Sequence, residues 1–243
     1  MQRQVVILAG GLGTRMYPGT KTVPKVLLPV LDRPFIFWQL DLLARNKIDK
    51  VILCVGFLGQ QVEKSVGNNY RGVEVQYSYE QSHALLGTAG AIKNAESLLE
   101  SFFGVLYGDS YLEIDYNSIF NAHVVSTFPA TMTVWKNKDK YDISNVTLSD
   151  NGKRVVCYKK TDEVKVFDYI DYGFSIFNKE VIISRIKSKE FFDLSDLHRV
   201  LSSENILGAF EIHKRFYEIG SKTGLQELED YLTKQHTKKE KTI

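Results

Sequence analysis

The sequence predicts an α/β fold in which a mostly parallel sheet is flanked by helices. Short apolar segments alternate with amphipathic ones as far as residue 110. The apolar segments are runs of β-branched residues, which is typical of strands buried on both faces of a parallel sheet. The first run, Val5 to Leu8, ends in a glycine-rich turn. Parallel strands require helical crossovers, so the expected arrangement is Rossmann-like.

The elements of the N-terminal half can be placed in order. After the strand Val5 to Leu8, Pro34 fits the first position of a helix that ends near Asn46, because apolar residues then recur on one helical face. The other elements expected before residue 110 are strands at 50–55, 73–79 and 103–107 and helices at 58–67 and 88–99.

Beyond Asp109 the pattern changes to short strands separated by turn signals such as Asp150-Asn151-Gly152. The expected strands are 131–135, 144–148, 155–159, 169–177 and 207–212, and the expected helices are 179–186, 194–203 and 223–232. This part should extend the sheet with antiparallel or mixed strands and form a smaller lobe. We therefore expect a single domain, 1–243, with halves 1–125 and 126–243.

Composition and charge argue against a nucleic-acid-binding, secreted or membrane protein. The formal charge is +2 with scattered basic residues, which gives no reason to expect a nucleic-acid partner. Cys54 and Cys157 lie in strand patterns, so a reducing compartment is expected. The N-terminus does not resemble a signal peptide and no apolar run reaches 18 residues, so we expect a cytoplasmic protein without a membrane partner. The run Lys234 to Lys241 should be a frayed end.

The glycine-rich turn is suited to a polyphosphate. Gly10, Gly11 and Gly13 let backbone N–H groups converge on an anion, and Arg15 and Lys25 add two cations. Two better-known loops do not fit. The dinucleotide fingerprint would need a third glycine where Met16 stands, and a helix that the following prolines forbid, while the Walker pattern is absent.

Two carboxylates also lie at strand ends. Glu80 follows the third expected strand and Asp109 follows the fourth. Ligands of open parallel sheets bind beyond the carboxyl ends of the strands, so these residues should share a crevice with the glycine turn. Asp109 would be well placed to hold Mg²⁺ against triphosphate oxygens.

The stretch from Gly10 to Pro29 resembles the signature G-G-x-G-T-R-L-x-P-x-T-x-x-x-P-K-x-L-L-P of sugar-1-phosphate nucleotidyltransferases, with Met16 in place of the usual leucine. The resemblance continues through much of the chain. It includes Leu86-Gly87-Thr88-Ala89-Gly90, Gly108-Asp109, Tyr158-Lys159-Lys160, Tyr172-Gly173 and Phe216-Tyr217-Glu218-Ile219-Gly220-Ser221.

The resemblance implies an enzyme that joins a nucleoside triphosphate to a sugar 1-phosphate with Mg²⁺ and releases pyrophosphate. It implies catalytic roles for Arg15, Lys25 and Asp109, and an acceptor site in the smaller lobe with Lys25, Lys160, Tyr172 and Gly173. It makes Asp109 and Glu218 the metal ligands. The implied nucleotide-binding residues are Leu8, Gly10, Gly11, Gly13, Thr14, Arg15, Glu80, Gly87, Thr88 and Gly108.

Several alternatives stay open at this stage. Lys159 replaces a glutamate that commonly touches the sugar, so the acceptor could be a non-sugar phosphate, and Glu218 replaces an aspartate. Glu80 could accept hydrogen bonds from guanine, which favours guanylyl transfer to a mannose- or heptose-like phosphate over cytidylyl or uridylyl transfer. A nucleotide-sensing regulatory subunit is the rival from another class, and the residues do not decide whether the chain forms a homodimer.

Overall fold

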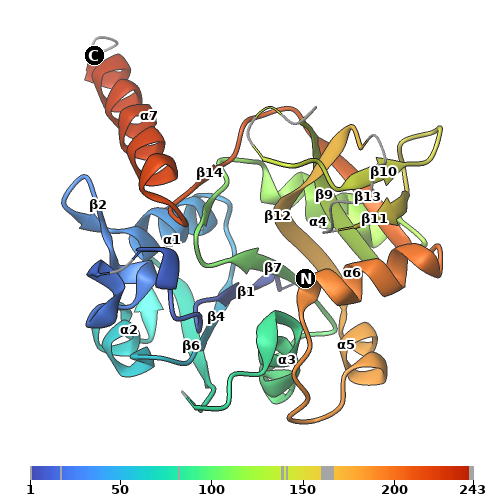
Figure 1. The fold of residues 1–243 in the computed structure, drawn as a ribbon, viewed down its shortest axis with the longest axis horizontal. Coiled ribbons are helices and arrows are strands. Elements are labelled where there is room, and N and C mark those ends of the chain that lie inside the picture. Colours follow the sequence, from blue (N-terminus) through green and yellow to red (C-terminus); the bar gives the residue numbers. More distant parts are fainter. Residues whose placement is uncertain are drawn as a thin grey trace.

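The computed structural model describes residues 2–16, 18–81, 83–137, 140, 142–159 and 167–240, without the side chains of Arg15, His236 and residues 238–240 (Figure 1). The N-terminal strands are β1 (Gln4–Leu8), β2 (Pro29–Val30), β3 (Arg33–Pro34), β4 (Lys50–Val55), β5 (Asn69–Tyr70), β6 (Val73–Tyr79), β7 (Phe102–Tyr107) and β8 (Ser110–Tyr111). The helices among them are α1 (Phe35–Arg45), α2 (Gly59–Val66), α3 (Gly87–Asn94), α4 (Tyr116–Val125) and the 3₁₀ turns Thr14–Met16, Gly19–Lys21, Lys25–Leu27 and Glu96–Leu98.

The second half of the chain begins after α4. Its strands are β9 (Ala130–Lys136), β10 (Val146–Leu148), β11 (Val155–Tyr158), β12 (Tyr169–Asn178), β13 (Leu207–Ile212) and β14 (Tyr217–Glu218). Its helices are α5 (Lys179–Arg185), α6 (Leu194–Ser203) and α7 (Lys222–Glu240).

The sheet has a parallel core of four strands in the order β6-β4-β1-β7. On the far side of β7 the sheet becomes mixed: β12 is antiparallel to β7, β9 is antiparallel to β12, and β13 is parallel to β9. The predicted α/β class with a sheet of mixed strand direction around a parallel core is confirmed.

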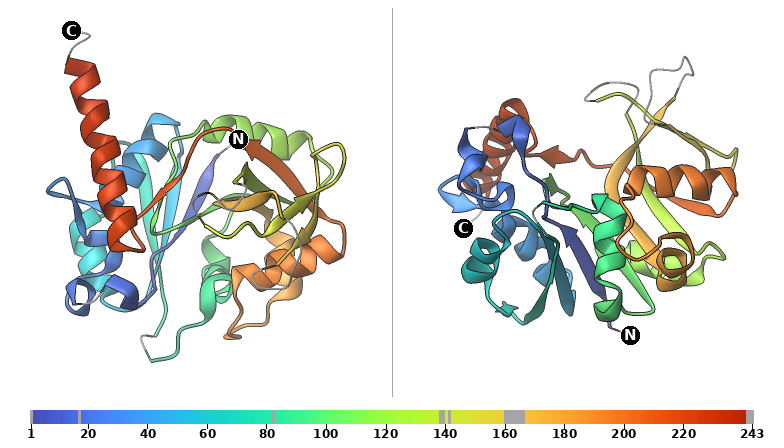
Figure 2. Two further views of the ribbon diagram at one scale, coloured as in Figure 1. Left: turned by 45° about the horizontal axis from the view of Figure 1, so that its top comes forward. Right: turned by 60° about the horizontal axis from the view of Figure 1, so that its bottom comes forward.

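Helices cover both faces of this sheet, and the side chains of consecutive strand residues point to opposite faces. Val5 and Ile7 belong to a core shared with α1, α2, α4 and the first half of α7, whereas Val6 packs on the face covered by α3, α5 and α6. Figure 2 shows these two helical layers from other directions. Burial on both faces explains the continuous apolar runs in the sequence.

The strands of the second half nearly close on themselves. β9 pairs with β12 and with β13, β12 pairs with β10, and β10 pairs with β11. A bridge between Arg154 and Gly208, supported by the Ala209 N–H donating to the Lys153 carbonyl, then links the β11 side back to β13. This lobe is attached to the parallel core through β12.

Several elements differ from expectation. The short strands β2, β3, β5, β8 and β14 were not predicted, and the helix expected at 88–99 ends at Asn94. Helix α4 was not predicted, and the prediction that the last helix ends near Leu232 before a frayed tail is wrong, because α7 continues to Glu240. No proline or glycine occurs from Thr233 onward, and the Thr233 hydroxyl donates to the Glu229 carbonyl at 2.8 Å. Figure 1 shows this part of α7 extending away from the body. None of the helices in the described ranges could cross a membrane.

Candidate active site

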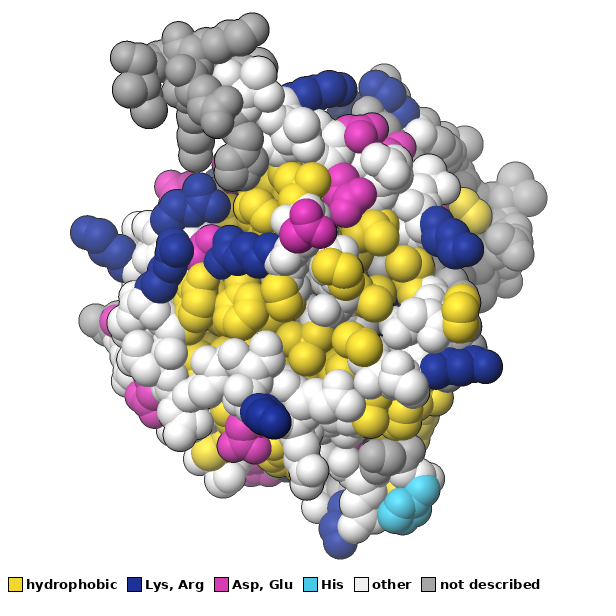
Figure 3. All heavy atoms as spheres, turned by 90° about the vertical axis from the view of Figure 1, so that its left-hand side faces the viewer, with side chains coloured by type: hydrophobic (Ala, Val, Ile, Leu, Met, Phe, Trp, Pro, Cys, Tyr) yellow, Lys and Arg dark blue, Asp and Glu magenta, His cyan; other side chains and the backbone are white. Residues whose placement is uncertain are grey.

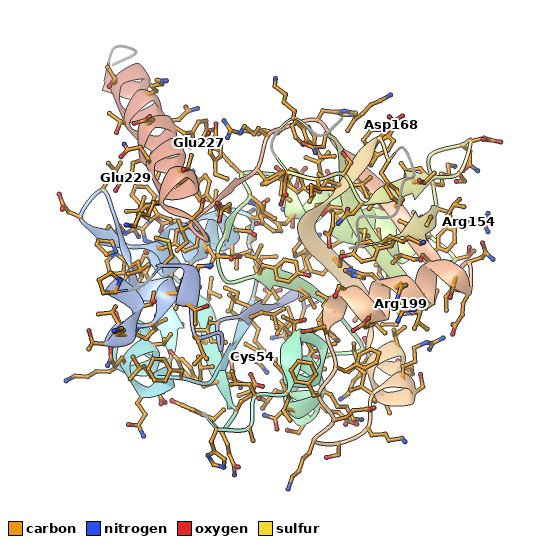
Figure 4. All side chains as sticks on the ribbon, viewed as in Figure 1. Cys54, Arg154, Asp168, Arg199, Glu227 and Glu229 are labelled. Carbon is orange, nitrogen blue, oxygen red and sulfur yellow. The ribbon has the colours of Figure 1, made fainter. Side chains whose placement is uncertain are left out.

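A cavity of about 400 Å³ opens at the carboxyl ends of the parallel strands. Part of its floor is a row of three register partners, Cys54 on β4, Leu8 on β1 and Tyr107 on β7. Figure 4 labels Cys54 in the centre of the molecule, close to α3. Burial holds the pKa of the Cys54 thiol far above its usual range, so this cysteine behaves as an apolar wall of the cavity.

Most of the predicted nucleotide site lines this one cavity. The predicted residues around it are Leu8, Gly10, Gly11, Gly13, Thr14, Lys25, Glu80, Gly87, Thr88, Gly108 and Asp109. Arg15 lies in the 3₁₀ turn Thr14–Met16, but its side chain is outside the described part of the structure.

The glycine turn is held in shape from within. Gly13 has φ +62°, and its carbonyl accepts hydrogen bonds from the Met16 N–H at 2.9 Å and the Thr20 hydroxyl at 2.8 Å. A Cβ on Gly10 would lie 2.8 Å from Glu80 Oε2, whereas a Cβ on Gly11 would meet nothing within 4 Å. Gly10 therefore permits contact with Glu80, and Gly11 leaves open space for a ligand.

Glu80 closes the cavity beyond β6. Its Oε1 accepts a hydrogen bond from the Leu86 N–H at 2.8 Å, and its Oε2 faces Gly10. Burial raises the pKa of Glu80 above its ordinary value, although the Leu86 hydrogen bond acts against the shift. The charged form of Glu80 can accept hydrogen bonds inside the cavity, and burial makes this form costly to hold in the folded protein.

This cost predicts a pH-dependent effect of Glu80→Gln. Because the folded-state pKa is raised, the native state binds the proton more tightly, and stability is lost as pH rises through the folded-state pKa. The neutral amide avoids the loss, so at pH 7 the variant should melt at a higher temperature than the parent. Below about pH 4, where the parent carboxyl is also neutral, the gap should close. Melting curves at both pH values check this, and an equal gap at both would contradict it.

Helix α3 begins at the cavity and is fixed by a segment from the second half. The Phe192 carbonyl accepts hydrogen bonds from the N–H groups of Ala89 and Gly90, and Asp193 Oδ1 accepts 3.2 Å hydrogen bonds from both the N–H and the hydroxyl of Thr88. A Cβ on Gly87 would lie 2.7 Å from the Phe192 carbonyl oxygen. The glycines of Leu86-Gly87-Thr88-Ala89-Gly90 therefore serve close backbone packing as well as the cavity.

The sequence analysis left out several residues that line the cavity, and three of them carry polar or aromatic side chains that face it from other elements. Asp193 and Phe191 come from this crossing segment, and Phe191 is 65% exposed. No local pattern marks them, because their position depends on contacts with α3. Tyr107 could have been noticed, since it directly precedes Gly108-Asp109 at a strand end.

Lys25, Asp109 and Glu218 come together at one side of the cavity. Lys25 Nζ lies 2.6 Å from Asp109 Oδ2, with the two side chains 16% and 30% exposed. The short strands β8 and β14 pair Ser110 with Glu218, and the Ile219 N–H donates to the Asp109 carbonyl at 2.9 Å. This pairing explains how a residue near the C-terminus reaches the strand-end aspartate.

The two carboxylates meet around Gly220. A Cβ on Gly220 would lie 3.3 Å from Asp109 Oδ2 and 3.2 Å from Lys25 Nζ, and it would overlap Glu218 Oε2. Glu218 also accepts hydrogen bonds from the Gly220 N–H and, at 2.7 Å, from the Ser221 hydroxyl. Within the described ranges, no group of three or more His, Cys, Asp or Glu could hold a metal. Two carboxylates beside a glycine fit Mg²⁺, which binds few protein ligands and completes its shell with waters and phosphate oxygens.

Of the four predicted acceptor residues, Lys25 lines the cavity and Gly173 lies next to Ser110 and Tyr107. Gly173 has φ +101° and donates its N–H to Asp171 Oδ1 at 3.0 Å, and a Cβ on it would lie 3.2 Å from Ser110 Oγ. Tyr172 is 1% exposed and packs edge-on against Phe216 in the core, so its ring does not line the cavity. Lys160 lies outside the described residues.

Known proteins are similar to this chain in sequence and in fold. A family model described as "Nucleotidyl transferase" matches residues 4–229. D-glycero-alpha-D-manno-heptose 1-phosphate guanylyltransferase of Aneurinibacillus thermoaerophilus is 33% identical over 65% of this chain and 67% of its own length. UTP--glucose-1-phosphate uridylyltransferase of Synechocystis sp. is 31% identical over 79% of this chain and 53% of its own, so the chain spans about half of that relative.

A solved structure shows the same fold. HddC from Yersinia pseudotuberculosis aligns with a TM-score of 0.78 and 23% identity over 95% of this chain and 100% of its own. The family match covers nearly the whole chain, which confirms the predicted enzyme class, a nucleotidyltransferase of EC type 2.7.7. The chain belongs to the nucleotidyl transferase family.

Proposed function

We propose that this protein transfers a nucleotidyl group from a nucleoside triphosphate to a sugar 1-phosphate, giving a nucleotide sugar and pyrophosphate. The observation that carries the proposal is the meeting of the glycine turn with Lys25, Asp109 and Glu218, where the N-terminal and C-terminal halves join. Such a junction can hold two anionic substrates side by side. Residues 1–125 would bind the donor and residues 126–243 the acceptor.

The donor would lie along the cavity with its base toward Glu80 and its phosphates toward the glycine turn, Arg15 and Lys25. We favour guanosine triphosphate, because Glu80 can accept hydrogen bonds from guanine N–H groups and because one relative is a guanylyltransferase. The uridylyltransferase among the relatives supports uridylyl transfer as the alternative. Cytidylyl transfer, and transfer to a non-sugar phosphate acceptor, are further alternatives. A cytoplasmic location is part of the proposal.

The reaction would be an in-line displacement. An oxygen of the acceptor phosphate forms a bond to the α-phosphorus, and the bond from that phosphorus to the bridging oxygen of pyrophosphate breaks. The attacking oxygen is already ionised at neutral pH, so no general base is required. Both reactants are anions, and two unit charges 4 Å apart repel by about 4 kcal/mol at an effective dielectric of 20.

The cations of the site would offset this repulsion. Lys25 lies where donor and acceptor meet, Arg15 would face the leaving pyrophosphate, and Lys160 would contact the acceptor phosphate. The backbone of Gly173, beside Ser110, would contact the acceptor. Mg²⁺ held by Asp109 and Glu218 would supply further positive charge for the triphosphate oxygens. Catalysis would rest on positioning and charge stabilisation.

A thermal-shift panel tests the choice of donor. The protein is heated with Mg²⁺ and each of ATP, GTP, CTP, UTP or dTTP at equal concentration. The true donor should stabilise the fold by about 2.7 kcal/mol at a hundredfold excess over its Kd. We expect the largest rise in melting temperature with GTP. A larger rise with UTP or CTP would favour the alternative, and equal shifts with all five would contradict base recognition at Glu80.

A further inference from the structure

Tyr107 lies at the β7 end of the cavity floor. Across the sheet, the strand ends run in order from β6, which leads into Glu80, through β4 and β1 to β7 and then β12, which carries Gly173. Tyr107 ends β7, and its Cδ2 lies 3.7 Å from where a Cβ on Gly173 would be. Glu80, the proposed contact to the base, and Tyr107 therefore lie on opposite sides of the strand ends of β4 and β1.

The Tyr107 ring is held in place, but its hydroxyl is not used by the protein. The ring packs against the core beneath α3 and α6 and also lines the cavity. Its backbone carbonyl accepts a 2.9 Å hydrogen bond from Gln39 Nε2. Among the described residues, no hydrogen bond involves the Tyr107 hydroxyl. A polar group that is half-buried in a binding cavity and lacks a protein partner is available for a ligand.

The charges around this hydroxyl define the role it can take. Asp109 and Asp193 line the same cavity, and Asp171 accepts a hydrogen bond from the N–H of Gly173, which lies beside Tyr107. A tyrosine side chain has an ordinary pKa of about 10, well above neutral pH. The phenol therefore stays protonated and can donate a hydrogen bond. A neutral donor near carboxylates suits a neutral hydroxyl group better than a phosphate oxygen, which would be repelled by the same carboxylates.

We propose that Tyr107 is a specificity-determining residue for the acceptor, and that its hydroxyl donates a hydrogen bond to a sugar hydroxyl of the bound sugar phosphate. This inference rests on the proposed function, because it assumes an acceptor bound between β7 and β12. The contact would help to distinguish acceptors by the presence and position of that hydroxyl, since a site built to bond a hydroxyl discriminates against analogues without one.

Tyr107→Phe tests the proposal, with Tyr77→Phe as the matched control. Each substitution removes one phenolic oxygen. The Tyr77 hydroxyl donates a 2.6 Å hydrogen bond to the Gly67 carbonyl, away from the cavity, so its loss should lower the melting temperature and leave KM values unchanged. The Tyr107 hydroxyl has no such bond, so its loss should leave the melting temperature unchanged.

Pyrophosphate release is measured with GTP and with UTP, using α-D-mannose 1-phosphate, D-glucose 1-phosphate and D-glycero-α-D-manno-heptose 1-phosphate as acceptors. For Tyr107→Phe we expect the acceptor KM to rise by roughly fivefold, in line with one lost hydrogen bond, while the triphosphate KM stays within twofold. Inhibition by inorganic phosphate, which has no sugar hydroxyl, should be the same in parent and variant.

The possible outcomes distinguish failure of the role proposed for Tyr107 from failure of the proposed function. If the parent protein releases pyrophosphate but Tyr107→Phe keeps the acceptor KM, the role of Tyr107 is overturned and the proposed function stands. A rise in the triphosphate KM alone would overturn it as well, because the hydroxyl would then belong to the donor site. No release by the parent with any of these acceptors would overturn the proposed function and this inference with it.

Discussion

Asp109→Asn should reduce pyrophosphate release by about a hundredfold or more at saturating Mg²⁺, while the protein still folds. The change removes one of the two carboxylates that meet around Gly220 and leaves Lys25 without its partner. Loss of a charge that stabilises the transition state is worth several kcal/mol in rate, and each tenfold is about 1.4 kcal/mol. The partly exposed Lys25–Asp109 pair contributes only about 1 kcal/mol to folding, so the melting temperature should fall by a few degrees at most.

Asp196→Asn is the matched control for this variant. Asp196 pairs with Arg199 at 3.3 Å on the exposed side of α6, so the same chemical change occurs outside the cavity. It should leave turnover and its Mg²⁺ dependence unchanged. If Asp109→Asn retained activity within threefold of the parent across a Mg²⁺ titration, Asp109 would be removed from the proposed metal site.

Gly220→Ala should be nearly as damaging, although it removes no charge. The added methyl group would overlap Glu218 Oε2 and come within 3.3 Å of Asp109 Oδ2, which is the space proposed for the metal. Glu218 would have to leave its hydrogen bonds to the Gly220 N–H and the Ser221 hydroxyl. We expect a fall in kcat of roughly tenfold to a hundredfold, and a higher Mg²⁺ concentration for half-maximal rate.

Gly19→Ala provides the comparison for steric effects. A Cβ on Gly19 would meet only Leu28 Cδ2, at 3.6 Å, which is ordinary contact. This variant should therefore keep parental kinetics. Parental kcat and Mg²⁺ dependence in Gly220→Ala would show that the carboxylates do not act through the space around Gly220.

The strands of the parallel core were predictable because their residue types are set by burial at each strand. Strands buried on both faces must be continuously apolar, and the segments 50–55 and 73–79 were predicted with the bounds that β4 and β6 have in the structure. The glycine turn and Gly108-Asp109 were also recognisable, because each follows such a strand directly. Residues at the ends of adjacent parallel strands must meet, so most of the predicted donor site does lie around one cavity.

Other features depend on contacts between distant segments. Phe191 and Asp193 reach the cavity only because backbone hydrogen bonds fix Phe192 across the start of α3. The residues around them form no local pattern that predicts this position. Helix α4 was missed although Asp115 caps its start by accepting a hydrogen bond from the Ser118 N–H. Its apolar residues pack against β12, where the Phe120 ring meets Phe174. Tertiary packing of this kind overrides weak local propensity. A binding role for the Tyr107 hydroxyl likewise follows only from the position of β7 between β1 and β12, which the sequence alone does not give.

The reaction itself tests the proposed nucleotidyl transfer most directly. Purified protein is incubated with Mg²⁺, GTP and either α-D-mannose 1-phosphate or D-glycero-α-D-manno-heptose 1-phosphate, and both pyrophosphate and the nucleotide product are quantified, with ATP, CTP, UTP, dTTP and D-glucose 1-phosphate as further combinations. We predict that pyrophosphate and a nucleotide sugar form in equal amounts and only when both substrates and Mg²⁺ are present. Tight nucleotide binding without pyrophosphate release in any combination would contradict it and indicate a nucleotide-sensing protein.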